Sequence, residues 1–165
     1  GLEVIEAKWL FDVNADQIQV VVQPQSIIHS MVEYEDGAVI AQLGTADMRL
    51  PIQYALYYPN RLHLSGDRLD FWKMKAITLE EPDMETFYGL KLAYEACRKG
   101  GNIPTAFNAA NEKAVAMFLD GKIRFLEIPE IAQACMEQCA YVANPSVEEI
   151  LATEQAAYEY IESRW

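Results

Sequence analysis

Apolar residues recur at helical spacing near the start of the chain and throughout its second half. Over residues 2–12, Leu2, Ile5, Trp9 and Leu10 repeat three to four positions apart, which predicts an amphipathic helix. After Pro82 the same spacing predicts four helices, at about 84–99, 105–120, 127–140 and 146–164. Because the connections between them are short, these four helices are expected to form an antiparallel bundle.

Capping residues mark several ends of these four helices. Gly100–Gly101 is expected to end the first helix and Gly121 the second. Ser146, followed three residues later by Glu149, forms a capping-box pattern at the start of the last helix. Thr153 offers a second N-cap, which would split that last helix in two.

Strand patterns are confined to the segment between the first helix and the bundle. Three segments have the alternating or continuous apolar residues that are typical of strands: 18–23, 27–34 and 38–43. Between the last two, Asp36–Gly37 predicts the tight turn of a hairpin. A short helix is predicted around 51–57, and one further short strand at 76–80. We therefore expect an antiparallel unit of at least three strands.

The change of pattern at Pro82 indicates the fold class. We expect an α+β protein in which a small, mainly antiparallel sheet with flanking helices is followed by an all-α four-helix bundle. The predicted division is a sheet unit at 1–59, a connector at 60–82 and the helical bundle at 83–165.

Composition narrows the range of partners. The 165 residues include 25 acidic and 13 basic side chains, for a net charge of −12, which argues against nucleic acid as a partner. No apolar run approaches the roughly 18 residues that cross a bilayer, so no membrane partner is expected. The three cysteines, Cys97, Cys135 and Cys139, fit helix interiors and are interpreted as buried, inert thiols of a reducing, cytosolic-type compartment.

Few residues suggest chemistry by spacing alone. Glu3 and Glu6 lie on one face of the first helix, where they could hold a metal or a cationic group, although spacing favours two solvated carboxylates. His29, in a strand that follows Ser26, is by position most often a structural histidine. His63 is given no role. The sequence contains no phosphate-binding glycine loop, paired-cysteine metal motif or nucleophile elbow.

Several longer runs resemble one enzyme family. They occur in order along the chain: GLEVIEAKWLF at 1–11, PQSIIHSMV at 24–32, AQLGTADMRLPI at 41–52, PNR at 59–61, LKLA at 90–93 and NAANE at 108–112. Together these runs are similar to stretches of the 1-deoxy-D-xylulose 5-phosphate reductoisomerases. Three positions depart from the family pattern, since Gln23, Ala46 and Tyr58 stand where the family often has His, Pro and Trp.

The resemblance implies an NADPH-dependent enzyme that uses Mg²⁺ or Mn²⁺. Such an enzyme rearranges and reduces 1-deoxy-D-xylulose 5-phosphate to 2-C-methyl-D-erythritol 4-phosphate in non-mevalonate isoprenoid synthesis. The family has a cofactor domain, a catalytic and dimerisation domain, and a C-terminal helical domain. Residues 1–59 would correspond to the second half of the catalytic domain, 60–82 to a connector, and 83–165 to the helical domain. A bacterial-type cytoplasmic location is implied, with a plastid as the alternative.

The resemblance also assigns roles residue by residue. Glu3 matches a metal-binding carboxylate that also contacts substrate. Glu6 matches a glutamate of the substrate pocket and is a candidate for proton handling. Ser26 matches a substrate-binding position, and His29 is assigned to the catalytic group beside substrate and nicotinamide. Met48 matches an apolar platform for the nicotinamide ring of NADPH.

The match begins inside a family motif, which leads us to expect a C-terminal fragment of the enzyme. The remaining metal ligands, the cofactor domain and an Asn-Lys pair for the substrate phosphate would then lie upstream, so the fragment alone is expected to be inactive. The resemblance also implies a homodimer of the whole enzyme, formed through the sheet of its catalytic domain. Two alternatives remain: a non-catalytic structural or dimerisation module derived from that enzyme, and a distinct metal-dependent enzyme that uses Glu3 and Glu6 with groups of a partner chain.

Overall fold

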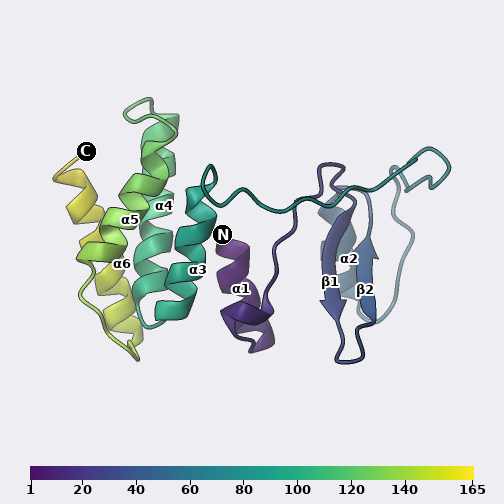
Figure 1. Cartoon of the computed structure of the whole chain (residues 1–165), viewed down its shortest axis with the longest axis horizontal. Coiled ribbons are helices and arrows are strands. Elements are labelled where there is room, and N and C mark those ends of the chain that lie inside the picture. The colour runs from purple at the N-terminus through teal and green to yellow at the C-terminus, as the bar shows by residue number, and fades with distance from the viewer. The chain divides into compact units, whose positions relative to one another are not determined.

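The computed structural model describes residues 1–165 as two compact units (Figure 1). The first unit contains Gly1–Val20 and Pro82–Trp165, and the second contains Val21–Glu81. Each unit is described below by itself. None of the helices has the length and apolar character needed to cross a membrane.

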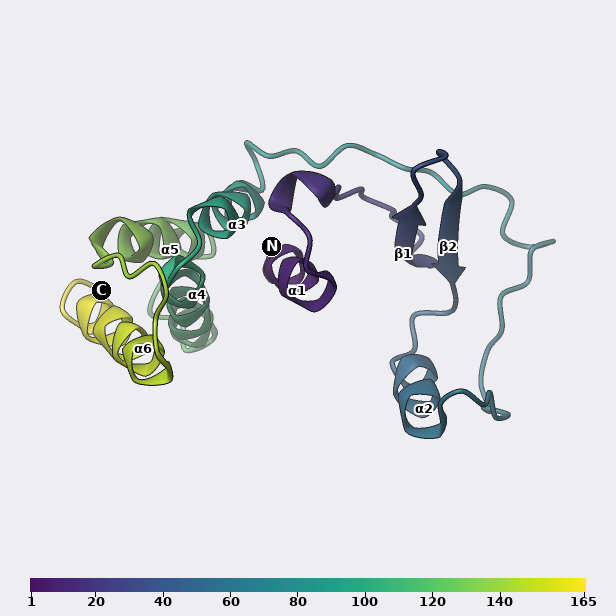
Figure 2. The same cartoon turned by 90° about the horizontal axis from the view of Figure 1, so that it is seen from below.

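The first unit is helical. It contains α1 (Leu2–Phe11), a 3-10 turn (Ala15–Gln17), α3 (Tyr88–Lys99), α4 (Ile103–Leu119), α5 (Glu127–Gln138) and α6 (Val147–Glu162). The helix α4 contacts α3, α5 and α6, and Figure 2 shows these four as one group. The predicted first helix and the predicted four-helix bundle are both confirmed.

The ends of these helices follow most of the predicted signals. The Glu149 N–H donates to Ser146 Oγ at 3.3 Å and the Ser146 N–H to Glu149 Oε2 at 2.8 Å, which confirms the capping box. Gly100 caps α3 with a φ of 64°. The predicted split at Thr153 is wrong, because its hydroxyl donates to the Glu149 carbonyl at 2.7 Å inside a continuous α6.

Small side chains allow the bundle helices to approach closely. Leu92, Ile131 and Ile161 are the largest fully buried apolar side chains, and the alanines of α3 and α4 surround them. Leu2 and Ile5 of α1 pack against this core, whereas Val4 belongs to a second cluster with Ala15 and Cys97 (the Val4 cluster). The predicted apolar face of α1 is therefore only partly covered, since its other large members, Trp9 and Leu10, are exposed.

The second unit contains a hairpin and one helix. The strands β1 (Ile28–Glu33) and β2 (Val39–Leu43) form an antiparallel pair, joined by a turn around Gly37, and α2 (Arg49–Tyr57) follows. The predicted hairpin and short helix are confirmed. The α+β class holds, with a two-stranded sheet in place of the three strands expected.

The predicted strands at 18–23 and 76–80 are wrong. Only one isolated bridge, between Val22 and Glu80, joins these segments. Ile18 and Val20 instead pack against the Val4 cluster, and the Tyr94 hydroxyl donates to the Ile18 carbonyl at 2.8 Å. Residues 18–20 thus direct their apolar side chains and a backbone acceptor toward helices rather than toward a neighbouring strand.

The boundaries between the two units differ from the domain boundaries that the sequence predicted. Residues 1–20 pack with residues 82–165, although the sequence grouped them with the hairpin in a unit at 1–59. The cause is the apolar contact of α1 and of residues 18–20 with α3. The assignment of 1–59, 60–82 and 83–165 to domains of a longer enzyme stays a prediction.

Candidate functional site

The helix α1 displays Glu3 and Glu6 to solvent. They are three residues apart on α1, so they share a face, and neither makes an ion pair. The start of the helix is fixed by close packing, because a Cβ added at Gly1 would lie 2.9 Å from Ala93 Cβ of α3. The nearby cation Lys8 donates to the Cys97 carbonyl at 3.3 Å. Both carboxylates are thus held on an ordered helix and remain available to a ligand.

The donor set of this chain does not make a metal site by itself. No group of three or more His, Cys, Asp or Glu side chains gathers anywhere in the structure. A hard divalent cation takes about six oxygen ligands, several of which can be waters. Glu3 could supply one carboxylate, and the other protein ligands of such an ion would have to come from outside this chain.

His29 lies at an irregularity of the hairpin. In the pairing of β1 with β2, Ile28 lies opposite Leu43, and Ser30 lies opposite the adjacent residue, Gln42. His29 is therefore the extra residue of a β-bulge. Its Nε2 lies 3.1 Å from the Gly44 carbonyl oxygen. Since a carbonyl only accepts, Nε2 must carry the proton in this contact, and Nδ1 is free to accept when the ring is neutral. His29 is exposed, as are the residues of β1 that follow it.

Ser26 lies in a tight turn just before β1. Its φ is +51°, in the left-handed region that non-glycine residues seldom occupy, and its side chain is exposed. The side chain of Gln23 holds the turn, because its Oε1 accepts from the Ile27 N–H at 2.7 Å and the Ile28 N–H at 3.3 Å. Gln23 therefore organises the turn that presents Ser26.

Met48 occupies the turn between β2 and α2. Its side chain is 71% exposed, and its backbone has α-helical torsions at the N-cap of α2. On either side of it, Asp47 and Arg49 form an ion pair, with 2.6 Å between Oδ2 and Nη2. An exposed thioether is a soft, polarizable apolar surface, and its chemistry suits contact with a flat ring.

The five predicted site residues thus fall into two groups. Glu3 and Glu6 belong to the helical unit, and Ser26, His29 and Met48 belong to the hairpin unit. Within the second group, His29 contacts Gly44, the first residue after β2, and the turn from Gly44 leads to Met48.

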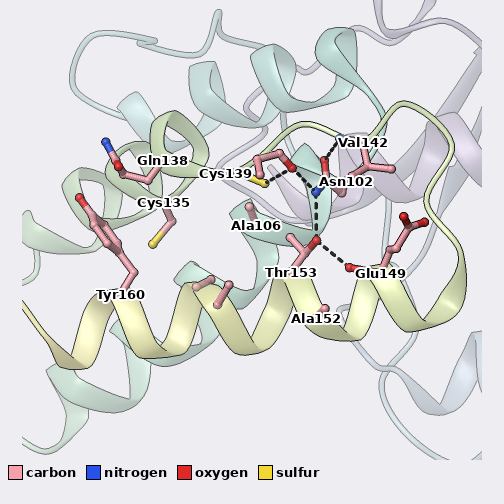
Figure 3. A pocket seen from close by; sticks show the side chains of 13 residues that line it. Asn102, Ala106, Cys135, Gln138, Cys139, Val142, Glu149, Ala152, Thr153 and Tyr160 are labelled. Atoms are coloured by element: carbon pink, nitrogen blue, oxygen red, sulfur yellow. Dashed lines mark hydrogen bonds between the residues drawn. The ribbon is translucent and has the colours of Figure 1, made fainter.

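A pocket that no sequence pattern indicated lies between α5 and α6. The pocket has a volume of about 460 Å³, is open to solvent on one side, and is lined mainly by small and apolar side chains around Asn102 (Figure 3). Asn102 is 2% exposed, and its amide donates to the Ala140 carbonyl at 2.9 Å and to Thr153 Oγ1 at 3.0 Å, while its Oδ1 accepts from the Val142 N–H at 2.9 Å. All polar atoms of this side chain are paired, so Asn102 serves the structure. The only sequence feature that could have drawn attention to Asn102 is its position directly after Gly100–Gly101.

The three cysteines behave as structural thiols. All are free, and Cys97 and Cys135 are buried as predicted, whereas Cys139 is only partly buried. Burial raises the pKa of each thiol, that of Cys135 to about 11. A thiol with a raised pKa holds little of the reactive thiolate, which agrees with the prediction of inert cysteines.

We expect Cys135 to resist alkylation in the native chain. Burial raises its pKa to about 11, so the thiolate is scarce at neutral pH, and iodoacetamide should modify Cys135 much more slowly than an exposed thiol. Peptide mapping by mass spectrometry measures the rate at each cysteine. The same chain in urea is the control, where all three should react alike. Rapid native modification of Cys135 would contradict the described burial.

The known proteins that this chain resembles point to one family. The family model described as the DXP reductoisomerase C-terminal domain matches residues 43–160. Curated proteins called 1-deoxy-D-xylulose 5-phosphate reductoisomerase are 70% identical in Agathobacter rectalis and 65% identical in Lachnospira eligens, each over all 165 residues. The chain spans 43% of the length of each of these relatives.

Solved structures of the same kind superpose on the chain. The reductoisomerase from Zymomonas mobilis in complex with NADPH is 43% identical, with a TM-score of 0.90 over 98% of this chain and 43% of that one. A DOX-P reductoisomerase in complex with NADPH, fosmidomycin and magnesium is 39% identical, with a TM-score of 0.92 over 98% of this chain and 42% of that one. The match to the family model and the identities to these relatives agree, and the chain belongs to the DXP reductoisomerase C-terminal domain family.

Proposed function

We propose that this chain forms the C-terminal part of an enzyme that converts 1-deoxy-D-xylulose 5-phosphate to 2-C-methyl-D-erythritol 4-phosphate. The observation that carries the proposal is 70% identity, over every residue of this chain, to a relative with the reductoisomerase name. NADPH and Mg²⁺ or Mn²⁺ are the proposed cofactors, because solved relatives are complexes with NADPH and with magnesium. The proposed setting is the non-mevalonate isoprenoid pathway in a bacterial-type cytoplasm, with a plastid as the alternative location.

Glu3 is proposed as the one metal ligand that this chain supplies, in contact with the substrate as well. Its exposure on the ordered first turn of α1 supports this role. A divalent cation in such an enzyme polarises a substrate carbonyl and stabilises negative charge on oxygen. Because a single carboxylate is a poor site for a hard cation, both the metal and NADPH are expected to be bound mainly by residues outside this chain.

The remaining site residues are proposed to handle and position the substrate. Glu6, on the same exposed face as Glu3, is a candidate to take or give a proton. Ser26 would donate a hydrogen bond to the substrate from its strained turn. His29 keeps Nδ1 available for substrate while Nε2 holds Gly44. Met48 is the proposed contact for the nicotinamide ring.

A second copy of the chain is the proposed partner of the hairpin. A two-stranded sheet has two unpaired edges and is marginal by itself. Val32, Val39 and Ile40 are each more than half exposed, so the hairpin offers apolar surface that a partner would cover. These features also favour the alternative function, a structural or dimerisation module without catalysis.

The isolated chain separates this proposal from an independent metal enzyme. We expect the 165-residue protein to bind Mn²⁺ weakly and to leave NADPH unoxidised, because it offers one candidate ligand and about two fifths of the length of its relatives. Calorimetric titration and NADPH absorbance measure the two quantities. Tight Mn²⁺ binding, or turnover by the chain alone, would show that it has a complete site of its own.

A hybrid protein tests whether this chain can complete an active reductoisomerase. In this hybrid, the matching 165 residues of the Agathobacter rectalis reductoisomerase are replaced by this chain, which is 70% identical there. The proposal requires the hybrid to consume NADPH in a substrate- and metal-dependent manner.

A further inference from the structure

The turn that carries Met48 is anchored at its first residue. Gly44 follows β2, its N–H donates to the Ile27 carbonyl at 3.0 Å, and its own carbonyl oxygen lies 3.1 Å from His29 Nε2. Both contacts reach back to the segment at the start of β1. The entry into the turn is therefore tied to the hairpin on two sides.

The far end of the turn is anchored by Asp47 and Arg49. One carboxylate holds both the backbone and the side chain of Arg49: Asp47 Oδ1 accepts from the Arg49 N–H at 3.0 Å, and the guanidinium Nε lies 3.0 Å from each carboxylate oxygen. Hydrogen bonds from Arg49 lower the pKa of Asp47, and the Asp47 carboxylate raises the pKa of Arg49, so the pair stays charged near neutral pH.

Met48 lies between these anchors with a fixed backbone and a free side chain. Its torsions are φ −61° and ψ −18°, and its carbonyl accepts from the Ile52 N–H at 3.2 Å at the start of α2. Its side chain is 71% exposed and belongs to neither apolar cluster. The turn thus presents one apolar side chain at a defined position.

Stability is a poor explanation for the Asp47–Arg49 pair. The Asp47 and Arg49 side chains are 26% and 62% exposed, respectively, and ion pairs at sites this open to solvent add little or nothing measurable to stability. The guanidinium is nevertheless confined from a second side, because Gly66 has a φ of +139° and a Cβ there would lie 3.2 Å from Arg49 Nη2. The Asp47–Arg49 pair adds little stability, yet its hydrogen bonds and the neighbouring Gly66 restrict where the guanidinium can lie. Its role is therefore better explained as fixing the conformation of the turn.

We propose that the Asp47–Arg49 ion pair is a positioning element that fixes Met48 for contact with the nicotinamide cofactor. Asp47 and Arg49 act through the turn and need not touch the cofactor themselves. This inference rests on the proposed function, since it takes Met48 as the nicotinamide contact.

The first test needs no cofactor and uses the 165-residue chain. We expect Arg49→Lys, which keeps the charge but loses the planar two-contact fork, to lower the backbone heteronuclear NOE at Met48, as should Asp47→Asn. The matched control is Asp70→Asn in the same unit, because Asp70 likewise accepts from the N–H two residues on, at 3.0 Å, and pairs with Lys73 at 3.3 Å. An unchanged NOE at Met48 in both Asp47 and Arg49 variants would overturn the proposal.

The second test measures cofactor affinity in the hybrid. Arg49→Lys should raise KM for NADPH about tenfold, the scale of one lost contact, with less than about a twofold change in KM for 1-deoxy-D-xylulose 5-phosphate. The double variant Asp47→Asn/Arg49→Lys should match the single variants, because all three remove the same pair. A merely destabilised protein would instead lose active enzyme, which lowers kcat and leaves both KM values unchanged.

The two tests separate the possible failures. A wild-type hybrid that is folded but inactive would refute the proposed function and this inference with it. An active hybrid whose Arg49 variant keeps the KM for NADPH of the parent would refute the positioning role and leave the proposed function intact.

Discussion

Replacing Asn102 with alanine should lower the free energy of unfolding of the helical unit by about 3 kcal/mol. The side chain makes three hydrogen bonds, to the Ala140 carbonyl, the Val142 N–H and Thr153 Oγ1, and all three partners lie more than 35 residues away in sequence. Alanine would leave the Ala140 carbonyl and the Val142 N–H without their side-chain partner, and the α5–α6 connection would keep only the hydrogen bond from the backbone N–H of residue 102 to the Val142 carbonyl, at 3.1 Å.

Urea denaturation followed by helical circular dichroism measures this effect. Asn108→Ala is the matched control, because Asn108 is an exposed asparagine on the same helix and its loss should change stability by less than about 0.5 kcal/mol. Should Asn102→Ala unfold at the urea concentration of the parent, the hydrogen-bond network around Asn102 does not hold the bundle together in the way described.

Replacing Glu3 with glutamine should reduce kcat/KM of the hybrid about a thousandfold. A catalytic metal stabilises developing charge by several kcal/mol, and each 1.4 kcal/mol corresponds to a factor of ten in rate. Glutamine keeps the shape of the side chain and one oxygen but removes the negative charge that a hard cation requires. The residual activity should need a higher Mn²⁺ concentration than that of the parent.

Steady-state kinetics at several Mn²⁺ concentrations test this role. The control is Glu130→Gln, an exposed carboxylate on α5 that has no predicted role in the site. Thermal unfolding of both variants should stay close to that of the parent, since a first-turn acid contributes only about 0.5 kcal/mol through the helix dipole. Activity within a few fold of the parent, with an unchanged metal requirement, would exclude Glu3 as a metal ligand.

Local signals account for the parts of the fold that the sequence predicted correctly. Helical spacing placed α1 and the four bundle helices, and the Ser146–Glu149 capping box placed the start of α6, because each signal lies within a few residues of its own partner. The shared face of Glu3 and Glu6 likewise follows from their spacing on one helix.

The errors come from contacts between distant residues. Ile18 and Val20 alternate like a strand, but their apolar side chains and the Ile18 carbonyl are used by helices. Thr153 resembles an N-cap, yet its hydroxyl is engaged by Glu149 within α6 and by Asn102 from 51 residues away.

The same limit applies to the candidate site. The bulge at His29 depends on how β1 pairs with β2, and a strict alternation pattern cannot contain it. Gly66 lies close to Arg49 only after the chain between them has folded back. The resemblance therefore predicted a role for Met48 as a nicotinamide contact, whereas the residues that hold its turn became visible only in the structure.

The most direct measurement of whether this chain completes a reductoisomerase is the product formed by the hybrid. With 1-deoxy-D-xylulose 5-phosphate, NADPH and Mn²⁺, we expect 2-C-methyl-D-erythritol 4-phosphate to appear in a one-to-one ratio with oxidised NADPH, as followed by phosphorus NMR and absorbance. The isolated chain should yield neither. A folded hybrid that leaves both substrate and NADPH unchanged would contradict the proposed function and favour the structural module.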